Sequence, residues 1–316
     1  MLEVRNLKTH FFTRHGVVKA VDGISFRVAE GKNLGLVGES GCGKSITVLS
    51  IMRLVPEPGR ILEGEILFQG EDLLKKSKPE MRKIRGARIS IILQDPLTSL
   101  NPAFTIGDQV GEAVRIHQHL RGNSVLAKVV EVLKLVRVPE AGMRIRDYPY
   151  QMSGGMRQRV SGAIALSCQP DLLIADEPTT SLDVSIQAQY LDLLKQIQEQ
   201  SGVSMIFVTH DFGIVARMCG QVAVMYAGKI VEMGEVREIF NNPLHPYTTA
   251  LLGCLPKLDM TSKLVTIEGE PPDLNRLPPG CSFAARCTNR KSICEERYPD
   301  EIVMNDHHKV SCWLKV

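Results

Sequence analysis

Apolar positions follow two different periods along the first 254 residues of the chain. Asn33–Val37 and residues 172–175 and 205–209 are short continuous apolar runs, which are typical of buried strands. Between these runs, residues 127–136 and 186–200 carry apolar side chains at helical spacing. Strands that alternate with helices predict an α/β domain with a largely parallel central sheet.

Other segments predict smaller elements around this core. Alternating apolar positions between residues 4 and 28 favour strands of an edge or mixed sheet. The runs 222–226 and 229–233, joined at Gly228, predict a hairpin. Apolar residues at helical spacing from Val48 predict a helix that continues to Val55, where the prolines that follow would stop it.

The composition fits a globular protein and excludes several functions. The 316 residues are 44% apolar and 23% charged, and the net charge of +3 argues against a dedicated nucleic-acid binder. No apolar stretch reaches the length of about 18 residues that a transmembrane helix needs, and the N-terminus lacks the apolar core of a signal peptide. We therefore expect a cytosolic protein that reaches a membrane only through a partner.

A glycine-rich loop follows the apolar run Asn33–Val37. Residues 38–45 read GESGCGKS, which fits the phosphate-loop pattern of a glycine, four residues, and then Gly-Lys-Ser. Such glycines let several backbone N–H groups point at one anion, and the helix N-terminus that follows also favours phosphate. Lys44 can contact the β- and γ-phosphates, and Ser45 can bind Mg²⁺. The residues expected to bind nucleotide here are Gly38, Glu39, Ser40, Gly41, Cys42, Gly43, Lys44, Ser45 and Ile46.

A pair of carboxylates follows the apolar run 172–175. In a nucleotide site, Asp176 can hold Mg²⁺, directly or through water, and Glu177 can orient and polarise the attacking water. An acidic pair after a strand is weak evidence alone. Together with the phosphate loop upstream, it predicts a site for nucleotide hydrolysis.

The segment SGGMRQR at 153–159 is the most specific signal, because here the sequence resembles the ABC ATPase family. The resemblance implies ATP as the nucleotide and two nucleotide-binding domains that pack head to tail. Ser153, Gly154 and Gly155 would then complete the site on the opposite subunit. It also implies the family fold: a RecA-like core with a mixed, largely parallel sheet, an antiparallel β subdomain and an α-helical subdomain.

The order of the remaining motifs matches the same family. Gln94 resembles the Q-loop glutamine, Ser181 to Asp183 resembles the D-loop at the dimer seam, and His210 resembles the switch histidine that reaches the γ-phosphate. The resemblance implies three catalytic residues, namely Glu177, His210 and Gln94. It implies that Mg²⁺ is held by Ser45, Gln94 and Asp176.

Adenine is expected to stack on a planar side chain near the N-terminus. By its distance from Lys44, His15 is the best candidate, and Phe12 is the alternative. Phe11 and Phe12 fit the apolar face of a strand equally well, so the residues alone leave this choice open.

The C-terminal third of the sequence indicates which subgroup of the family the chain resembles. Residues 244–252 read LHPYTTALL, and with the proline-rich segment that follows they resemble the ATPases of dipeptide, oligopeptide and nickel permeases. This implies ATP-driven import of di- or oligopeptides at the cytoplasmic face of the membrane, with nickel import as the alternative. It also implies a second ATPase subunit in a heterodimer (a homodimer is the alternative), two transmembrane permease subunits and an extracytoplasmic peptide-binding protein.

A soluble ABC ATPase that acts on DNA or ribosomes is the rival hypothesis. DNA-repair members usually carry long coiled-coil insertions, and translation factors usually carry two ATPase cassettes. This chain has one cassette and no long heptad run, which disfavours both, and we expect no nucleic-acid partner.

We expect an ATPase domain at 1–254, with its helical subdomain at about 95–160, and an extension at 255–316 with four clustered cysteines. Their spacing lacks the two close CxxC pairs of a zinc ribbon and suits an iron–sulfur cluster at least as well. The ATPases of dipeptide permeases resemble this tail, which implies a 4Fe–4S cluster, with zinc or free thiols as alternatives. The expected ligands are Cys281, Cys287, Cys294 and Cys312.

Overall fold

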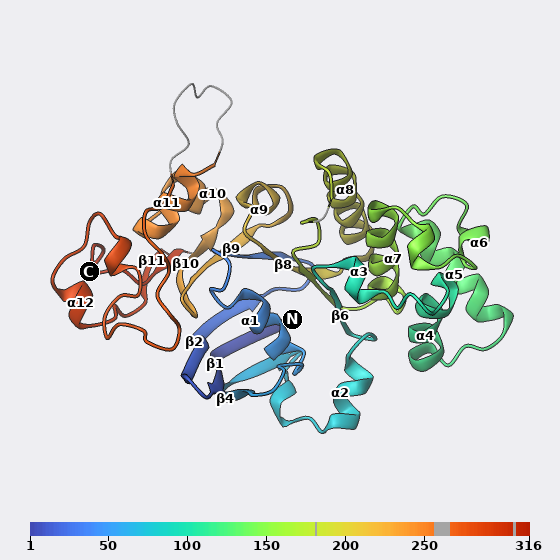
Figure 1. Cartoon of the computed structure of the whole chain (residues 1–316), viewed down its shortest axis with the longest axis horizontal. Helices are drawn as coiled ribbons and strands as arrows, with labels where there is room; N and C mark the ends of the chain where they lie inside the picture. Colours follow the sequence, from blue (N-terminus) through green and yellow to red (C-terminus); the bar gives the residue numbers. More distant parts are fainter. Residues whose placement is uncertain (181, 256–265, 306–307) are drawn as a thin grey trace. The chain divides into compact units, whose positions relative to one another are not determined.

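A computed structural model describes residues 1–180, 182–255, 266–305 and 308–316. The chain forms two compact units (Figure 1). Unit 1 comprises Met1–Val28, Asn33–Leu74 and Val208–Val316. Unit 2 comprises Ala29–Lys32 and Lys75–Phe207.

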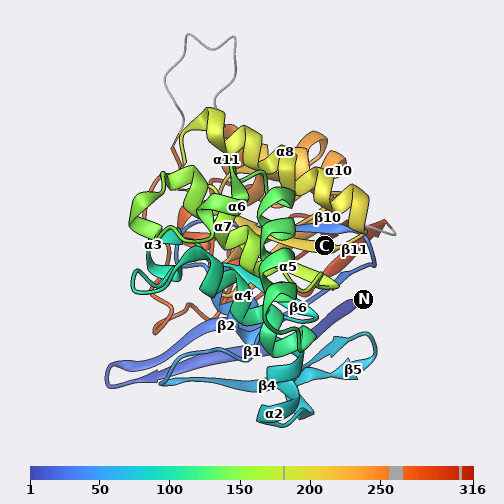
Figure 2. The same ribbon diagram turned by 90° about the vertical axis from the view of Figure 1, so that its right-hand side faces the viewer.

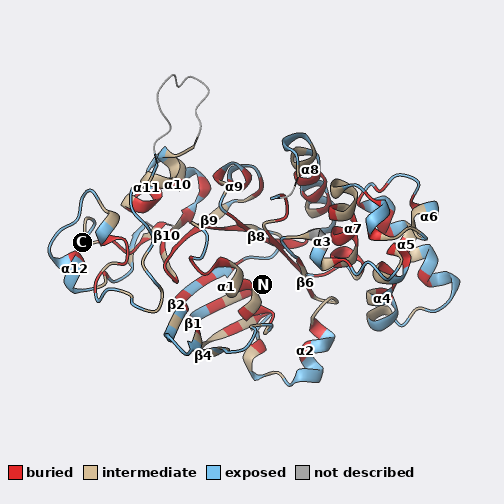
Figure 3. Cartoon of the chain, in the orientation of Figure 1, coloured by how far each residue is buried: buried red, intermediate tan, exposed pale blue. Residues whose placement is uncertain are grey.

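The first sheet of unit 1 is antiparallel and contains the N-terminal strands. Its order is β2 (Gly16–Val28), β1 (Leu2–Thr13), β4 (Gly59–Phe68) and β5 (Glu71–Asp72). The end of β2 alternates buried apolar residues with exposed polar ones, as its sequence predicts. Figure 3 shows the same alternation of buried and exposed positions along this sheet.

The second sheet of unit 1 joins strands from distant parts of the sequence. Neighbouring strands follow the order β11 (Ile302–Asn305), β12 (His308–Val310), β10 (Lys229–Glu235), β9 (Gln221–Tyr226) and β3 (Asn33–Val37). Strands β3 and β9 are parallel, whereas β9 and β10 form the predicted hairpin. The C-terminal strands therefore extend the sheet that contains β3, the strand before the phosphate loop.

Short helices complete unit 1, and the first is shorter than the sequence predicts. Helix α1 (Lys44–Ile51) ends four residues before Val55, because Arg53 adopts a left-handed backbone with φ 50° that cannot continue a helix. The other helical segments of this unit are η1 (Leu73–Lys75), whose last residue belongs to unit 2, α9 (Phe212–Met218), α10 (Val236–Asn241), α11 (Pro246–Gly253), η3 (Ala284–Arg286) and α12 (Ile293–Glu296).

Unit 2 combines a parallel strand pair with most of the long helices. Strand β6 (Ile89–Ile92) pairs in parallel with β7 (Leu172–Asp176), and β8 (Ser204–Thr209), which begins in this unit, lies on the other side of β7. The helical segments of unit 2 are α2 (Lys78–Ile84), α3 (Pro96–Ser99), α4 (Ile106–Gln118), α5 (Asn123–Leu135), α6 (Ala141–Arg144), η2 (Pro149–Gln151), α7 (Gly154–Leu166) and α8 (Val184–Ser201).

Helices α4, α5 and α7 pack against one another within unit 2 (Figure 2). Their buried faces carry residues such as Val110, Val129 and Val160, which solvent does not reach. Among the residues that the structure describes, no helix has both the length and the apolar character that crossing a bilayer requires.

Candidate functional site: phosphate loop, carboxylate pair and thiol pocket

The phosphate loop connects β3 to α1 in unit 1, and two of its glycines admit no side chain. Gly43 has φ 108°, and a Cβ atom there would lie 2.1 Å from the carbonyl oxygen of Ala20. A Cβ atom on Gly38 would lie 2.2 Å from the carbonyl oxygen of Met225. The backbone of the loop is thus packed against β2 and β9, and only glycine allows this close approach.

Lys44 is the first residue of α1, and its side chain is 5% exposed. Its Nζ atom donates to the carbonyl oxygens of Gly38 at 2.7 Å and Glu39 at 2.9 Å. The ammonium group is therefore held inside the curve of the loop, where a bound phosphate would meet it. Ser45 and Ile46 follow in the first turn of α1.

Two residues that no sequence motif indicates also hold this loop. The hydroxyl oxygen of Tyr247 accepts the backbone N–H of Glu39 at 2.9 Å, and Arg286 forms an ion pair with the Glu39 carboxylate. Tyr247 lies within the LHPYTTALL segment, which served only to identify a subgroup. Because both residues are more than 200 positions from Glu39, no local pattern could have revealed either contact.

The carboxylate pair stands at the end of β7 in unit 2. Asp176 is 6% exposed, and Glu177 adopts φ 45°, an unusual backbone conformation for a residue with a side chain. Gln94 donates its Nε2–H to Oε2 of Glu177 at 2.9 Å, and the Thr180 hydroxyl donates to the same oxygen at 3.0 Å. The structure thus brings Gln94 and Glu177 together, with the carboxylate oriented by both donors.

The segment SGGMRQR begins helix α7 of unit 2. Ser153 is the N-cap residue, and its hydroxyl oxygen accepts the backbone N–H of Met156 at 3.4 Å. A Cβ atom on Gly155 would lie 2.8 Å from Cγ2 of Ile186, so the start of α7 packs closely against α8. Gly154 and Gly155 form the first turn, whose N–H groups suit an anion.

Two further predicted residues stand at helix starts. Asp183 is the N-cap of α8 in unit 2 and is exposed, whereas Ser181, the first D-loop residue, lies outside the described residues. His210 follows β8 in unit 1 and is also exposed. Asp211 comes next and begins α9 by accepting the N–H of Gly213.

Both candidates for the adenine contact belong to the β1–β2 hairpin. His15 is exposed in the turn, where its N–H donates to the Thr13 hydroxyl oxygen at 3.2 Å. Phe12 is 44% exposed near the end of β1, and the Arg60 guanidinium lies 5.8 Å from the centre of its ring. The adenine contact therefore stays a prediction.

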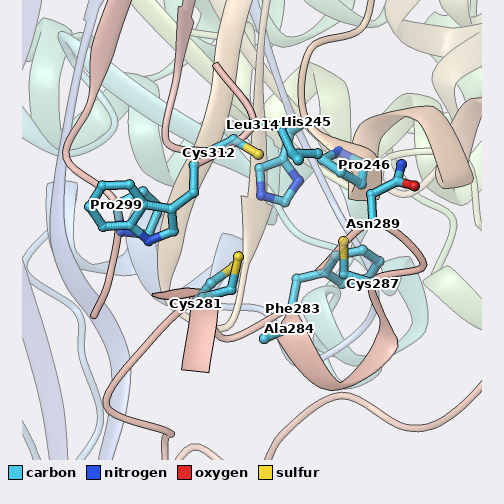
Figure 4. A pocket seen from close by; sticks show the side chains of 12 residues that line it. His245, Pro246, Cys281, Phe283, Ala284, Cys287, Asn289, Pro299, Cys312 and Leu314 are labelled. Carbon is cyan, nitrogen blue, oxygen red and sulfur yellow. The ribbon is translucent and has the colours of Figure 1, made fainter. Parts of the chain in front are cut away.

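The four clustered cysteines of the C-terminal segment line one pocket in unit 1. Cys281, Cys287, Cys294 and Cys312 share its wall with His245. Figure 4 shows the sulfur atoms of Cys281, Cys287 and Cys312 and the imidazole of His245 on different sides of the same space. All eight cysteines of the chain are free thiols.

Each sulfur atom of this thiol pocket is also near a backbone N–H group. The backbone N–H of Lys291 donates to Cys294 at 3.4 Å. The backbone N–H groups of Phe283, Asn289 and Leu314 lower the pKa of the cysteine two positions earlier, although burial outweighs them. Burial raises the pKa of Cys281 to about 11, with further contributions from the other three thiols. Without a bound cation Cys281 is therefore neutral near pH 7, and binding a cation through its sulfur would release the proton.

No group of three or more histidine, cysteine, aspartate or glutamate side chains among the described residues could hold a single metal ion. The described residues therefore give no support to a metal site here, either for zinc or for an iron–sulfur cluster. A metal centre at the thiol pocket stays a prediction.

The fold and the phosphate loop define a nucleotide-binding protein, and comparison with known families specifies its class. A family model described as ABC transporter matches residues 21–180, and one described as oligopeptide/dipeptide transporter, C-terminal region, matches residues 231–294. The chain belongs to the ABC transporter ATPase family, with the C-terminal region of its oligopeptide/dipeptide group. The predicted family and fold class are thereby confirmed.

Individual relatives agree with this assignment over the full length. The chain is 51% identical to the dipeptide transport ATP-binding protein DppD of Bacillus subtilis (strain 168), covering 100% of this chain and 95% of that protein. It is 47% identical to the oligopeptide transport ATP-binding protein OppD of the same organism, covering 99% of this chain and 88% of that protein. A solved dimeric structure of MJ0796, a bacterial ABC transporter cassette, matches with a TM-score of 0.67 at 26% identity, covering 75% of this chain and 99% of that one.

Proposed function

We propose that this chain is the ATP-hydrolysing subunit of an importer of di- or oligopeptides. The observation that supports this most directly is the identity of 51% over the whole chain to a dipeptide transport ATP-binding protein. The match covers the whole of this chain, so its span includes the phosphate loop, the carboxylate pair and the C-terminal segment.

In this proposal the phosphate loop binds the triphosphate of ATP. Lys44 is already held inside the loop by two carbonyl oxygens, and it exchanges them for phosphate oxygens. Ser45, Gln94 and Asp176 offer the hydroxyl, amide and carboxylate oxygens that Mg²⁺ prefers. When bound, Mg²⁺ neutralises charge on the phosphates. Adenine stacks on His15, with Phe12 as the alternative.

Hydrolysis depends on Glu177, which accepts the proton of the attacking water. Gln94 and Thr180 orient its carboxylate through the hydrogen bonds described above. His210 contacts the γ-phosphate. Ser153, Gly154 and Gly155 of a second cassette cover the phosphates from the opposite side, and Asp183 lies at the seam between the cassettes.

The proposed partners follow from the same assignment. A second ATPase subunit, different from this one, pairs with the chain, and the pair docks on two transmembrane permease subunits at the cytoplasmic face of the membrane. A peptide-binding protein delivers the cargo from outside. Closing and reopening of the cassettes would then drive the permease.

Uptake by reconstituted vesicles tests the function. The chain is purified with its permease and second ATPase, placed in proteoliposomes with ATP on the ATPase side, and supplied with binding protein and labelled dipeptide or tripeptide. We expect uptake that stops when ATP is replaced by ADP. Nickel uptake without peptide uptake would assign the alternative cargo, and transport of neither would contradict the proposal.

We further propose that the thiol pocket holds a 4Fe–4S cluster through Cys281, Cys287, Cys294 and Cys312. Four thiols around one pocket fit the thiolate ligands of such a cluster, and the Lys291 N–H that donates to Cys294 at 3.4 Å fits its N–H···S bonds. The cluster would offset part of the charge of the pocket's thiolates and crosslink segments that have little secondary structure.

Anaerobic purification followed by iron, sulfide and zinc analysis tests the cluster. We expect iron and acid-labile sulfide in equal amounts, with a broad visible absorbance that Cys287→Ser abolishes and Cys254→Ser, outside the pocket, leaves intact. A colourless protein with stoichiometric zinc, or with no metal, would exclude it.

A further inference from the structure

An ion pair joins the C-terminal segment to the phosphate loop. Arg286, at the end of η3, donates from Nη1 to Oε2 of Glu39 at 2.7 Å and from Nη2 to Oε1 at 2.9 Å. This is the two-pronged arrangement that fixes a guanidinium and a carboxylate in one plane. The Arg286 side chain is 4% exposed and that of Glu39 is 26% exposed, so solvent screens the pair only partly.

The guanidinium is fixed by its surroundings as well as by Glu39. Its Nε–H donates to the carbonyl oxygen of Glu268 at 3.1 Å, Nη2 also donates to the carbonyl oxygen of Ile267, and Nη1 donates to the Tyr226 hydroxyl oxygen. The Glu39 carboxylate raises the pKa of Arg286 further above its ordinary value. Arg286 is therefore a rigid charge, which the fold of the C-terminal segment places beside the loop.

Glu39 itself is held at three points. Its carboxylate binds Arg286, its N–H donates to the Tyr247 hydroxyl oxygen at 2.9 Å, and its carbonyl oxygen accepts from Lys44 at 2.9 Å. Two of these contacts come from residues beyond position 244. The first part of the phosphate loop is thus held in shape by a segment that carries none of the nucleotide-binding motifs.

We propose that Arg286 is a positioning residue for ATP binding, acting through Glu39. It holds the loop in its binding shape before the nucleotide arrives, which reduces the ordering that binding would otherwise require. It also neutralises a carboxylate in the loop that would repel the triphosphate. This inference rests on the proposed function, because it concerns ATP at the same loop.

The pair also joins the phosphate loop to the thiol pocket. Arg286 directly precedes Cys287, and Phe283, whose ring lies 5.9 Å from the Arg286 guanidinium, lines that pocket. The residue that contacts Glu39 and the pocket residue Cys287 are therefore joined by one peptide bond.

Nucleotide titration of single and double variants of the full chain tests the proposal. We expect Arg286→Gln to raise the Kd for a fluorescent ATP analogue about tenfold. A change of this size corresponds to the free energy of one charged hydrogen-bonded pair. Hydrolysis at saturating ATP should change much less. Arg286→Lys keeps the charge without the two-pronged geometry, so its Kd should lie between those of Arg286→Gln and the wild type.

The double variant Glu39→Gln/Arg286→Gln separates positioning from general destabilisation. Removing the unpaired carboxylate as well should restore part of the affinity lost in Arg286→Gln. If the two substitutions only destabilised the protein, their losses of affinity would add. Arg290→Gln is the matched control, since Arg290 is an exposed arginine of the same segment that pairs with Glu295 at 3.5 Å.

The outcomes separate this inference from the proposed function. Wild-type affinity in a cooperatively folded Arg286→Gln, or losses that simply add in the double variant, would overturn the positioning role. If Arg286→Gln does not fold, the Kd of Arg286→Lys decides, and a wild-type value overturns the proposal. Failure of the wild type to bind the analogue, or unchanged binding by Lys44→Ala, would instead contradict ATP binding at this loop.

Discussion

The phosphate loop and the thiol pocket both belong to unit 1, but they are built in different ways. The loop is eight consecutive residues, and its shape depends on backbone groups and on glycines that pack against Ala20 and Met225. The pocket is built from side chains on short loops and helical turns between Cys281 and Cys312 and from His245. A contiguous motif with a fixed backbone shape identifies its ligand class. Dispersed thiols identify only a kind of chemistry, and the surrounding fold must place them.

The largest effect is expected from changing Glu177, the residue assigned to hydrolysis. This change tests whether a contiguous motif identifies the role of its residues. Glu177→Gln should lower ATP hydrolysis about 10²–10⁴-fold, because an amide cannot accept the proton of the attacking water. ATP binding should persist, since the phosphate loop is unchanged. Phosphate release and nucleotide titration measure the two effects.

The matched control is Glu199→Gln, which makes the same change at an exposed position on α8 and should leave turnover unchanged. Wild-type hydrolysis by Glu177→Gln would show that a motif in the expected place can still be assigned the wrong role.

A buried carboxylate beside the thiol pocket should give the next largest effect. Glu232 on β10 accepts the backbone N–H groups of Leu244 and His245 and contacts Nε2 of His308 at 2.7 Å. Both Glu232 and His308 are buried. Glu232→Gln leaves one acceptor oxygen and places an N–H against another donor, which should lower the free energy of unfolding by about 3 kcal/mol.

Urea unfolding monitored by circular dichroism measures this effect. Glu235→Gln, at the exposed end of the same strand, is the control and should shift the midpoint little. An unchanged midpoint for Glu232→Gln would mean that the segment around His245 is not held through this carboxylate, and that the pocket depends less on distant contacts than the comparison implies.

Much of the fold could be predicted because its elements have strong local signals. Strand Asn33–Val37 has the predicted bounds, and the hairpin at Gly228 is where the turn glycine indicates. Helix α1 is shorter than predicted because Arg53 adopts a left-handed backbone conformation. The neighbouring residues do not predict this conformation. The ends of elements depend on such single residues more than on the periodic pattern.

Some residues of the candidate site could likewise be predicted from local motifs, whereas others could not. Lys44, Gln94 and Glu177 could be named from motifs, because their chemistry requires those residue types at that spacing. Tyr247 and Arg286 could not be named, since an ordinary tyrosine and arginine gain their importance only when the fold places them at Glu39. Contacts of this kind need the structure.

The smallest expected effect concerns the reactivity of cysteines in the two regions. Cys42 lies within the phosphate loop, and its burial raises the pKa of the thiol, although Lys44 beside it acts in the opposite direction. Cys287 is less buried than Cys42, and its pKa is raised as well. Because the thiolate is the reactive form and must be reached by the reagent, iodoacetamide should modify Cys42 about tenfold more slowly than Cys287 in metal-free protein.

Peptide mass spectrometry after timed alkylation between pH 7 and pH 9 measures both rates. Each rate should rise with pH, since each thiol must first lose its proton, and Cys42 should remain the slower one throughout. Cys254, which does not line the thiol pocket, serves as an internal reference. Faster modification of Cys42 than of Cys287 would mean that the phosphate loop opens readily without nucleotide. The phosphate loop would then not be the rigid structure, built from backbone groups, that the comparison with the thiol pocket assumes.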